Sequence, residues 1–269
     1  MNHLLRELAP VSEDAWSAIE AEASRTLRHF LAARKVVDFS GPHGWTHSAE
    51  TLGRVDALSA APTAGVEAAT RRVRPLAELR TPFEMARREL EAIDRGAGDY
   101  DTQPVIDAAR QAAAAEDAAV FHGYDAAGIA GISESSPHSP VIISDDYNEY
   151  PRTVARAVAT LQSAGIAGPF TIALGPRCYT GVIETTERGG YPVLEHIRLI
   201  LDGPVVWAPA VDGAVVVSLR GGDFQLTCGQ DFSIGYLDHD AETVRLYLEE
   251  SMTFHANSPD AGIALVYAD

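Results

Sequence analysis

Cysteine is scarce in this sequence: 269 residues include only Cys178 and Cys228, and neither belongs to a CxxC pair. A disulfide framework needs several cysteines, so the expectation is two reduced thiols. No stretch approaches the about 18 uninterrupted apolar residues that a membrane helix requires, and the start MNHLLREL lacks the apolar region of a signal peptide. The sequence therefore predicts a cytoplasmic protein with no membrane partner.

Positive charge is also limited. Lys and Arg number 21 against 38 Asp and Glu, which gives a formal charge of −17. Because phosphate binding needs clustered cations, no nucleic-acid partner is expected. The basic run at Arg71–Arg74 fits a charged strand edge better than a binding patch.

The most strongly patterned stretch is an alanine-rich segment from Gln103 to Gly123, with eight alanines. Pro104 suits a first helical turn and Gly123 suits a helix end, so the segment predicts a rod of roughly 30 Å. Val105, Ile106, Ala109, Ala113, Val120 and Phe121 fall on one side, whereas Asp107, Arg110, Gln111 and Glu116 fall on the others. Such a spine suits a scaffold, although an ordinary core helix of an enzyme has the same pattern.

The chain before the spine predicts two further helices and a ribbon. An amphipathic pattern indicates a helix from Ser12 to about Lys35. Residues 45–80 have poor apolar alternation and a turn near Pro62–Gly65, which predicts a projecting β-ribbon. Thr81–Glu84 reads as a capping box with proline at the first helical position, and it predicts a helix to Gly96.

The chain after the spine predicts an α/β unit at about 137–220, followed by antiparallel strands from Gly222. Asp212-Gly213, between two apolar runs, predicts a hairpin. The tail AGIALVY is expected to add one strand to the closing sheet. The fold class is therefore α+β, without an internal repeat.

No strong catalytic or metal-binding constellation is present. His43 and His47 flank a loop, and Asp145, Asp146 and Glu149 lack the pattern of a calcium loop. Glu187–Gly190 has too few glycines for a phosphate loop. We therefore expect no metal and no catalytic residue.

One alternative is a cysteine hydrolase. Cys178 begins a predicted helix, where the helix dipole favours a thiolate, and His196 or His239 would serve as its base. Neither histidine lies in a recognisable signature, so a small buried cysteine is the preferred interpretation.

Seven segments resemble a known family, in the family's order and over essentially the whole chain. They are LLRELAPVSEDAW (4–16), ARKVVDFSGP (33–42), EDAAVFHGYDAAGIAGI (116–132), AGIAGPF (164–170), RGGYPVLEHIRLIL (188–201), WAPAVDGAVVVSLRGGDFQL (207–226) and GYLDHDAETVRLYLEE (235–250). Together they resemble the encapsulins, the linocin-type shell proteins of bacterial nanocompartments.

The resemblance implies the Hong Kong 97-like fold of tailed-phage major capsid proteins. Its domains would be 1–44, an N-terminal lumenal helix and the start of the peripheral domain; 45–80, the extended loop; 81–136, the peripheral domain with the spine helix; 137–221, the axial domain; and 222–269, the return of the peripheral domain. The function implied is a self-assembling icosahedral shell of 60 copies that encloses cargo enzymes, either peroxidases or ferritin-like iron oxidases. It is not an enzyme, and a secreted bacteriocin is an alternative that rests on the family's older name.

The resemblance also implies two sites. The targeting peptide of the cargo would bind Leu27, Leu31, Arg34, Asp38, Phe232 and Ile234. The five-fold pore would be lined by Thr185, Thr186, Glu187, Arg188, Gly189, Gly190 and Tyr191. Some members bind flavin near a tryptophan, but Thr102 occupies that position here, with Tyr100 close by, so no cofactor is expected.

Overall fold

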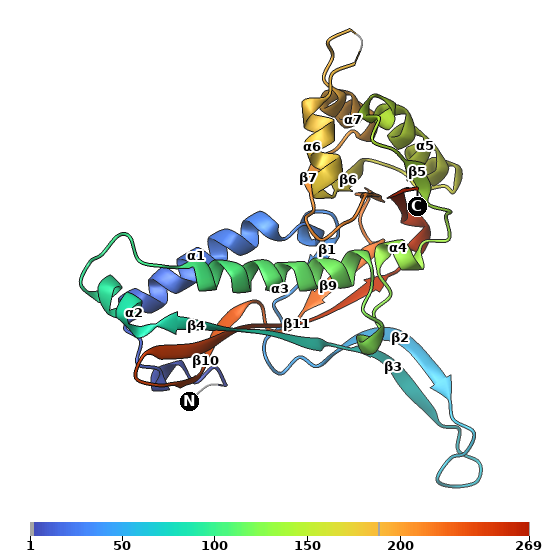
Figure 1. Ribbon diagram of the computed structural model, residues 1–269. Coiled ribbons are helices and arrows are strands. Elements are labelled where there is room, and N and C mark those ends of the chain that lie inside the picture. Colours follow the sequence, from blue (N-terminus) through green and yellow to red (C-terminus); the bar gives the residue numbers. More distant parts are fainter. Residues whose placement is uncertain (1–2, 188, 269) are drawn as a thin grey trace.

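The computed structural model describes residues 3–187 and 189–268. Figure 1 shows an elongated part in which two long helices lie over a sheet, a second part above one end, and a ribbon that extends below. The α-helices are α1 (Glu13–Phe30), α2 (Arg87–Asp94), α3 (Gln103–Phe121), α4 (Ile132–Ser135), α5 (Tyr150–Ser163), α6 (Pro176–Glu184) and α7 (Val193–Leu201). The strands are β1 (Asp38–Ser40), β2 (Ala49–Ala57), β3 (Ala69–Pro75), β4 (Ala77–Ala86), β5 (Val141–Ile143), β6 (Phe170–Leu174), β7 (Val205–Trp207), β8 (Ala214–Ser218), β9 (Phe224–Cys228), β10 (Ser233–His239), β11 (Thr243–Ala256) and β12 (Gly262–Tyr267).

Helix α1 begins as the sequence predicts but ends early. The Ser12 side chain accepts the backbone N–H of Ala15, as an N-cap should. The helix ends at Phe30 rather than near Lys35, and a short 3-10 turn follows at Ala33–Lys35. We call the segment Leu31–Lys35 the elbow.

The elbow is held by a buried carboxylate of the spine helix α3. Asp117 accepts the backbone N–H of Ala32 at 2.9 Å and that of Ala33 at 2.8 Å. These bonds satisfy donors that a continued α1 would have directed to its own carbonyl groups. They therefore provide a physical reason why the helix stops where it does.

The spine helix α3 confirms the predicted element. It runs from Gln103 to Phe121, and Ala109, Ala113, Val120 and Phe121 are buried. Its face contacts α1 on one side and β4 with β11 on another. The prediction was wrong for Glu116, which was assigned to another side but lies three residues after Ala113 and four before Val120 and is fully buried with them.

The sheet below the helices is built around the long strand β11. Strands β4 and β10 pair with it antiparallel, β9 pairs with its C-terminal end, and β1 pairs with β9 in parallel. The capping box predicted at Thr81–Glu84 is wrong, because these residues lie inside β4. Thr81, Phe83 and Met85 are buried in alternation, and the proline is tolerated because β4 is an edge strand.

The ribbon consists of β2 and β3, which pair antiparallel with each other. It confirms the predicted ribbon, although Ala77–Arg80 already belongs to β4. In the described part of the chain, the two strands form a sheet of their own and leave Val55 and Val73 exposed. A two-stranded ribbon of this kind is marginal unless it packs on something else.

The second part contains the sheet β5-β12-β8-β6-β7, with α5, α6 and α7 packed on it. The hairpin predicted at Asp212-Gly213 is wrong: β7 and β8 both pair with β6, which lies between them. The C-terminal strand was also misplaced. Strand β12 pairs with β5 and β8 in this second sheet, rather than closing the sheet around β11.

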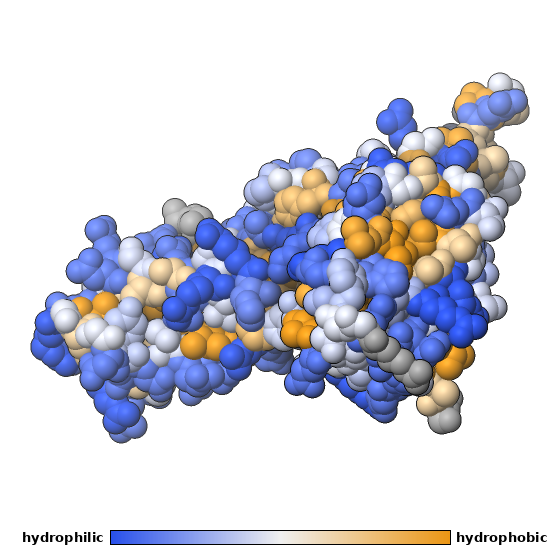
Figure 2. Space-filling view, turned by 90° about the horizontal axis from the view of Figure 1, so that it is seen from above, coloured by the Kyte–Doolittle hydropathy of each residue, from blue (hydrophilic) through white to orange (hydrophobic). Residues whose placement is uncertain are grey.

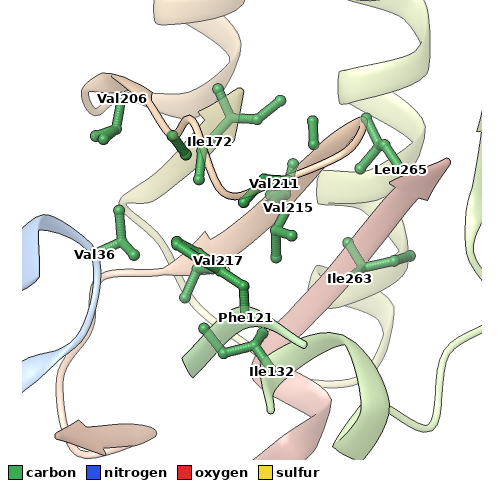
Figure 3. Close-up of a cluster of buried hydrophobic side chains, with 14 of the residues drawn as sticks. Val36, Phe121, Ile132, Ile172, Val206, Val211, Val215, Val217, Ile263 and Leu265 are labelled. Carbon is green, nitrogen blue, oxygen red and sulfur yellow. The ribbon is translucent and has the colours of Figure 1, made fainter. Parts of the chain in front are cut away.

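A shared core joins the two parts. Figure 3 shows Val36 from beyond the elbow and Phe121 from the end of α3 near Val217 of β8 and Ile263 of β12. Ile132 of α4 belongs to the same cluster. The spine and the elbow therefore position the second part relative to the first.

The carboxylate of Asp117 is expected to be essential for the stability of the elbow. Asp117→Ala leaves two buried N–H groups without an acceptor, which lowers the free energy of unfolding by about 1–3 kcal/mol. Denaturant unfolding of the full chain measures this. The control is Asp107→Ala on the exposed face of the same helix, and equal losses in both variants would contradict the role of Asp117.

Candidate functional site

A groove lies between α1, the elbow and the start of β10, with a volume of about 530 Å³. Leu27 comes from the last turns of α1 and Leu31 from the elbow, and Phe232 and Ile234 come from the chain that enters β10. Leu27, Leu31 and Ile234 are each at least nine-tenths buried. They therefore present only their edges to the groove, and most of each side chain belongs to the core.

Charged side chains surround the apolar floor of the groove. Arg6, Arg28 and Lys35 line it together with Glu20, and Arg6 forms an ion pair with Glu20. Ser24 lies on α1 one turn after Glu20 and one turn before Arg28, and it is half-buried. An apolar floor with a polar rim suits an extended peptide whose alternate side chains point into the floor.

Arg34 lies at one end of the groove and is held from several sides. Its Nε and Nη2 contact the carboxylate of Glu116, with Nε–Oε2 at 2.8 Å, and its Nη1 donates to Asp231 at 2.8 Å. The guanidinium also lies over the ring of Phe232, 5.0 Å from its centroid. Burial opposes the charge of Arg34, but the hydrogen bonds and charges of these carboxylates raise its pKa overall.

The structure brings five of the six predicted peptide-binding residues together and places the sixth elsewhere. Asp38 accepts the backbone N–H of Gly222 and borders a smaller hollow with Lys35 and Gly221. It lies in β1, which pairs with β9, and it is not among the residues that line the groove. The groove also includes residues that the sequence did not single out: Leu4, Arg6, Glu20, Ala23, Ser24, Arg28, Lys35, Asp231, Ser233 and Leu248.

The sequence contained a signal from which some of these groove residues could have been predicted. Ala23 and Ser24 are one turn before the predicted Leu27, and Asp231 and Ser233 flank the predicted Phe232. Leu4 gave no such signal. It reaches the groove because its backbone carbonyl accepts the N–H of Tyr236, which ties the N-terminal segment to β10.

The loop predicted to line a pore projects from the second part, between α6 and α7 (Figure 1). The backbone of Glu187 donates to the carbonyl of Tyr191, and Thr185 accepts the N–H of Val193. The carboxylate of Glu187 also forms a hydrogen bond of 2.6 Å with Nδ1 of His196. Arg188 lies outside the described residues.

The model of the Linocin_M18 family, described as encapsulating protein for peroxidase, matches residues 1–253. The chain belongs to this family.

Other encapsulins are similar along their whole length. The type 1 encapsulin shell protein of Rhodospirillum rubrum is 53% identical over 270 residues, which cover 98% of this chain and 96% of the relative. The corresponding protein of Mycobacterium tuberculosis is 44% identical over 265 residues, with 98% and 99% coverage.

Solved structures confirm the predicted fold. A virus-like particle from Pyrococcus furiosus gives a TM-score of 0.67 at 16% identity and covers 91% of this chain and 96% of that one. The capsid of an empty GTA particle gives a TM-score of 0.54 at 15% identity, with 89% and 90% coverage. This encapsulin has the Hong Kong 97-like capsid fold.

The geometry around Cys178 argues against a cysteine hydrolase. The thiol is fully buried and accepts a hydrogen bond of 2.7 Å from the hydroxyl of Tyr150, with the hydroxyl of Tyr267 at 3.1 Å. Burial raises the pKa of the Cys178 thiol, although the two tyrosines oppose the shift. His196 instead contacts Glu187, and His239 contacts Tyr236 in the first sheet.

The remaining candidate metal ligands have other partners. The rings of His43 and His47 contact each other, with centroids 4.8 Å apart, and Asp145 forms an ion pair with Arg177. Asp146 accepts the backbone N–H of Asn148. Within residues 3–187 and 189–268, no three His, Cys, Asp or Glu side chains are arranged to hold a metal ion.

The expected flavin position lies at the start of the spine helix. Thr102 precedes α3 directly, and Tyr100 lies in the loop before it. The ring of Tyr100 makes no contact with another aromatic ring in the described part of the chain. Whether a flavin binds this encapsulin stays a prediction from the sequence, which favours none.

Both thiols are expected to react slowly with an alkylating reagent near neutral pH in the folded protein. The reason is that Cys178 and Cys228 are fully buried and burial raises both pKa values, that of Cys228 to about 12. Mass spectrometry of the alkylated protein measures the rate. The denatured chain, in which both thiols should react quickly, is the control, and rapid labelling of Cys178 in the folded protein would restore the hydrolase alternative.

Proposed function

We propose that copies of this chain assemble into a closed icosahedral shell of 60 subunits that encloses a cargo enzyme. The observation that carries the proposal is the match to encapsulin shell proteins along the whole chain. The role is structural, and the chain itself supplies no catalytic residue. On the same resemblance, we place the compartment in the cytoplasm. The described residues contain no helix long and apolar enough to span a bilayer.

Exposed apolar surface on the single chain supports assembly. Val55 of the ribbon is 64% exposed, and Leu199 of α7 is 72% exposed. Figure 2 shows mainly hydrophilic residues over the narrow end of the molecule, whereas hydrophobic residues gather on the broad end. Contact with further copies would cover these side chains and give the ribbon a surface to pack on.

The groove is the proposed docking site for the C-terminal targeting peptide of the cargo. Its apolar floor, formed by the edges of Leu27, Leu31 and Ile234, would accept aliphatic side chains, and the charged rim would fix the direction of the peptide. The groove would then face the lumen of the shell. The family's description names peroxidase, so a peroxidase is the first cargo to test, before a ferritin-like iron oxidase.

The loop at residues 185–191 is the proposed lining of a pore at the five-fold axis. The carboxylate of Glu187 would form a ring of negative charge in the symmetric assembly, partly offset wherever His196 is protonated. Arg188 belongs to the same proposed lining and would add a ring of positive charge, so the two rings would offset each other in part.

Electron microscopy of the purified full-length protein tests the assembly. We expect uniform hollow particles, and small oligomers alone under native conditions would defeat the proposal. Val73→Asp, which places a charge on the exposed apolar side of the ribbon, is expected to reduce particle yield while circular dichroism shows a folded chain. Normal particle yield from this variant would contradict the role of the ribbon in contacts between copies.

Ser24→Trp tests the groove, because Ser24 lines it and is half-buried, so a bulky side chain there fills the groove without entering the core. We expect intact but empty shells, measured by mass spectrometry of co-purifying proteins. Replacing Leu31 with a charged residue would be a poorer test. Leu31 is only 7% exposed, so a charge at this position would destabilise the subunit itself.

Ser17→Trp is the matched control, since Ser17 is exposed on the same helix but does not line the groove. Shells of this variant should load cargo as the unmodified protein does. Loading of the Ser24→Trp shells at that same level would refute the groove as the docking site.

A further inference from the structure

A cluster of three carboxyl groups around one guanidinium lies beneath the end of the groove. Glu116 comes from the spine helix, Glu250 from the central strand β11 and Asp231 from the turn before β10. All three contact Arg34 of the elbow. The cluster therefore joins four segments that are far apart in the sequence.

The charges in this cluster do not balance if every carboxyl group is ionised. Arg34 carries one positive charge, and its strongest contacts are with Glu116, whereas Asp231 takes Nη1. Glu250 has the longest of the three contacts, 3.3 Å from its Oε2 to Nη2, and it shares that nitrogen with Glu116. An uncompensated carboxylate at a fully buried position is costly, and such a group usually takes up a proton instead.

The position of Glu250 favours the protonated form. Its side chain has no exposed surface, and its Oε1 has no hydrogen-bond partner among the described residues. Its carboxyl group also lies close to that of Glu116, because Nη2 of Arg34 donates to Oε2 of both glutamates, and two adjacent buried carboxylates repel each other. Burial, followed by the charge of Glu116, raises the pKa of Glu250 well above its ordinary value.

Among the residues that the structure describes, Arg34 is the one positive group that acts on Glu250. Glu116 faces it from α3, Arg34 from the elbow, Asp231 from the turn before β10, and the buried thiol of Cys228 from β9. Of these, only Arg34 is cationic, and it is shared. Asp117 points away from this cluster, toward the backbone of Ala32 and Ala33.

We propose that Glu250 holds a proton at neutral pH, and that loss of this proton at alkaline pH loosens the elbow that carries Arg34 at the end of the groove. The second buried negative charge would repel Glu116 and draw Arg34 toward Glu250, away from Asp231. Asp231 and Arg34 both line the groove, so the arrangement of charges at this end of the groove would change when the proton is lost. No occupant of the groove is needed for the effect.

The pH dependence has a definite sign. The folded protein holds this proton more tightly than the unfolded chain, in which a glutamate has a pKa of about 4.3. Stability from the cluster is therefore greatest at acidic pH and falls as the pH rises toward the raised pKa of Glu250. Glu250→Gln keeps the shape of the protonated acid and cannot ionise, so it removes this dependence.

Infrared spectroscopy of the assembled full-length protein, labelled with carboxyl-13C glutamate, tests for the proton directly. At neutral pH we expect the carbonyl band of a protonated glutamic acid, its loss in Glu250→Gln, and its loss in the unmodified protein at alkaline pH. The label separates this band from that of Asp117, whose pKa burial raises to about 7. A spectrum of Glu250→Gln identical to that of the unmodified protein would overturn the proposal.

Hydrogen exchange of the elbow amides tests the mechanical consequence. At alkaline pH, residues 31–35 should exchange faster in the unmodified protein than in Glu250→Gln, and the melting temperature of the variant should fall less with rising pH. The matched control is Glu84→Gln, an exposed glutamate on β4 of the same sheet, which should behave as the unmodified protein does. Equal exchange rates in Glu250→Gln and the unmodified protein would overturn the proposal. If the variant does not fold, the infrared titration of the unmodified protein decides the proposal, because a glutamic acid band that does not decrease at alkaline pH would overturn it.

Discussion

The structure depends on the contact between two adjacent buried carboxylates of the spine helix and the elbow. Asp117 accepts the backbone N–H groups at the start of the elbow, and Glu116 holds the guanidinium of Arg34. These bonds lie in an environment shielded from water, where a polar group without a partner is costly. They therefore end α1 at Phe30 and fix the direction in which the chain leaves it.

Two consequences follow from this fixed direction. Leu31 and Arg34 reach the same groove as Leu27 although the helix has ended between them. Val36, beyond the elbow, enters the core that joins the elongated part to the second sheet (Figure 3). One cluster of polar contacts thus shapes the groove and also sets the relation of the two parts of the subunit.

The rest of the subunit is built for contacts outside itself. The ribbon pairs only with itself within the described chain and exposes valines, and helix α7 exposes Leu199. Exposed apolar side chains do not stabilise a monomer, whereas in a capsid the neighbouring copies cover them. The match to encapsulins and to capsid structures agrees with that arrangement.

Local patterns in the sequence were sufficient for several elements. The spine helix was predicted from its alanines, Pro104 and Gly123, and the ribbon from its poor alternation and its central turn. The resemblance to encapsulins, which covers the whole chain, predicted the fold. Five of the residues that it implied for peptide binding line one groove, and their role stays a prediction. These successes share a cause: each depends on residues close in sequence or on their order along the chain.

What the sequence could not determine was pairing between distant segments. Thr81–Glu84 has the pattern of a helix cap but forms part of β4, because its four residues pair with Arg245–Leu248 of β11. The hairpin at Asp212-Gly213 was wrong because β6 lies between the two strands, and β12 belongs to the second sheet. Glu116 lies three residues after Ala113 and four before Val120, which puts it on the buried side of the helix, but its partner Arg34, 82 positions away, was decided only by the tertiary structure.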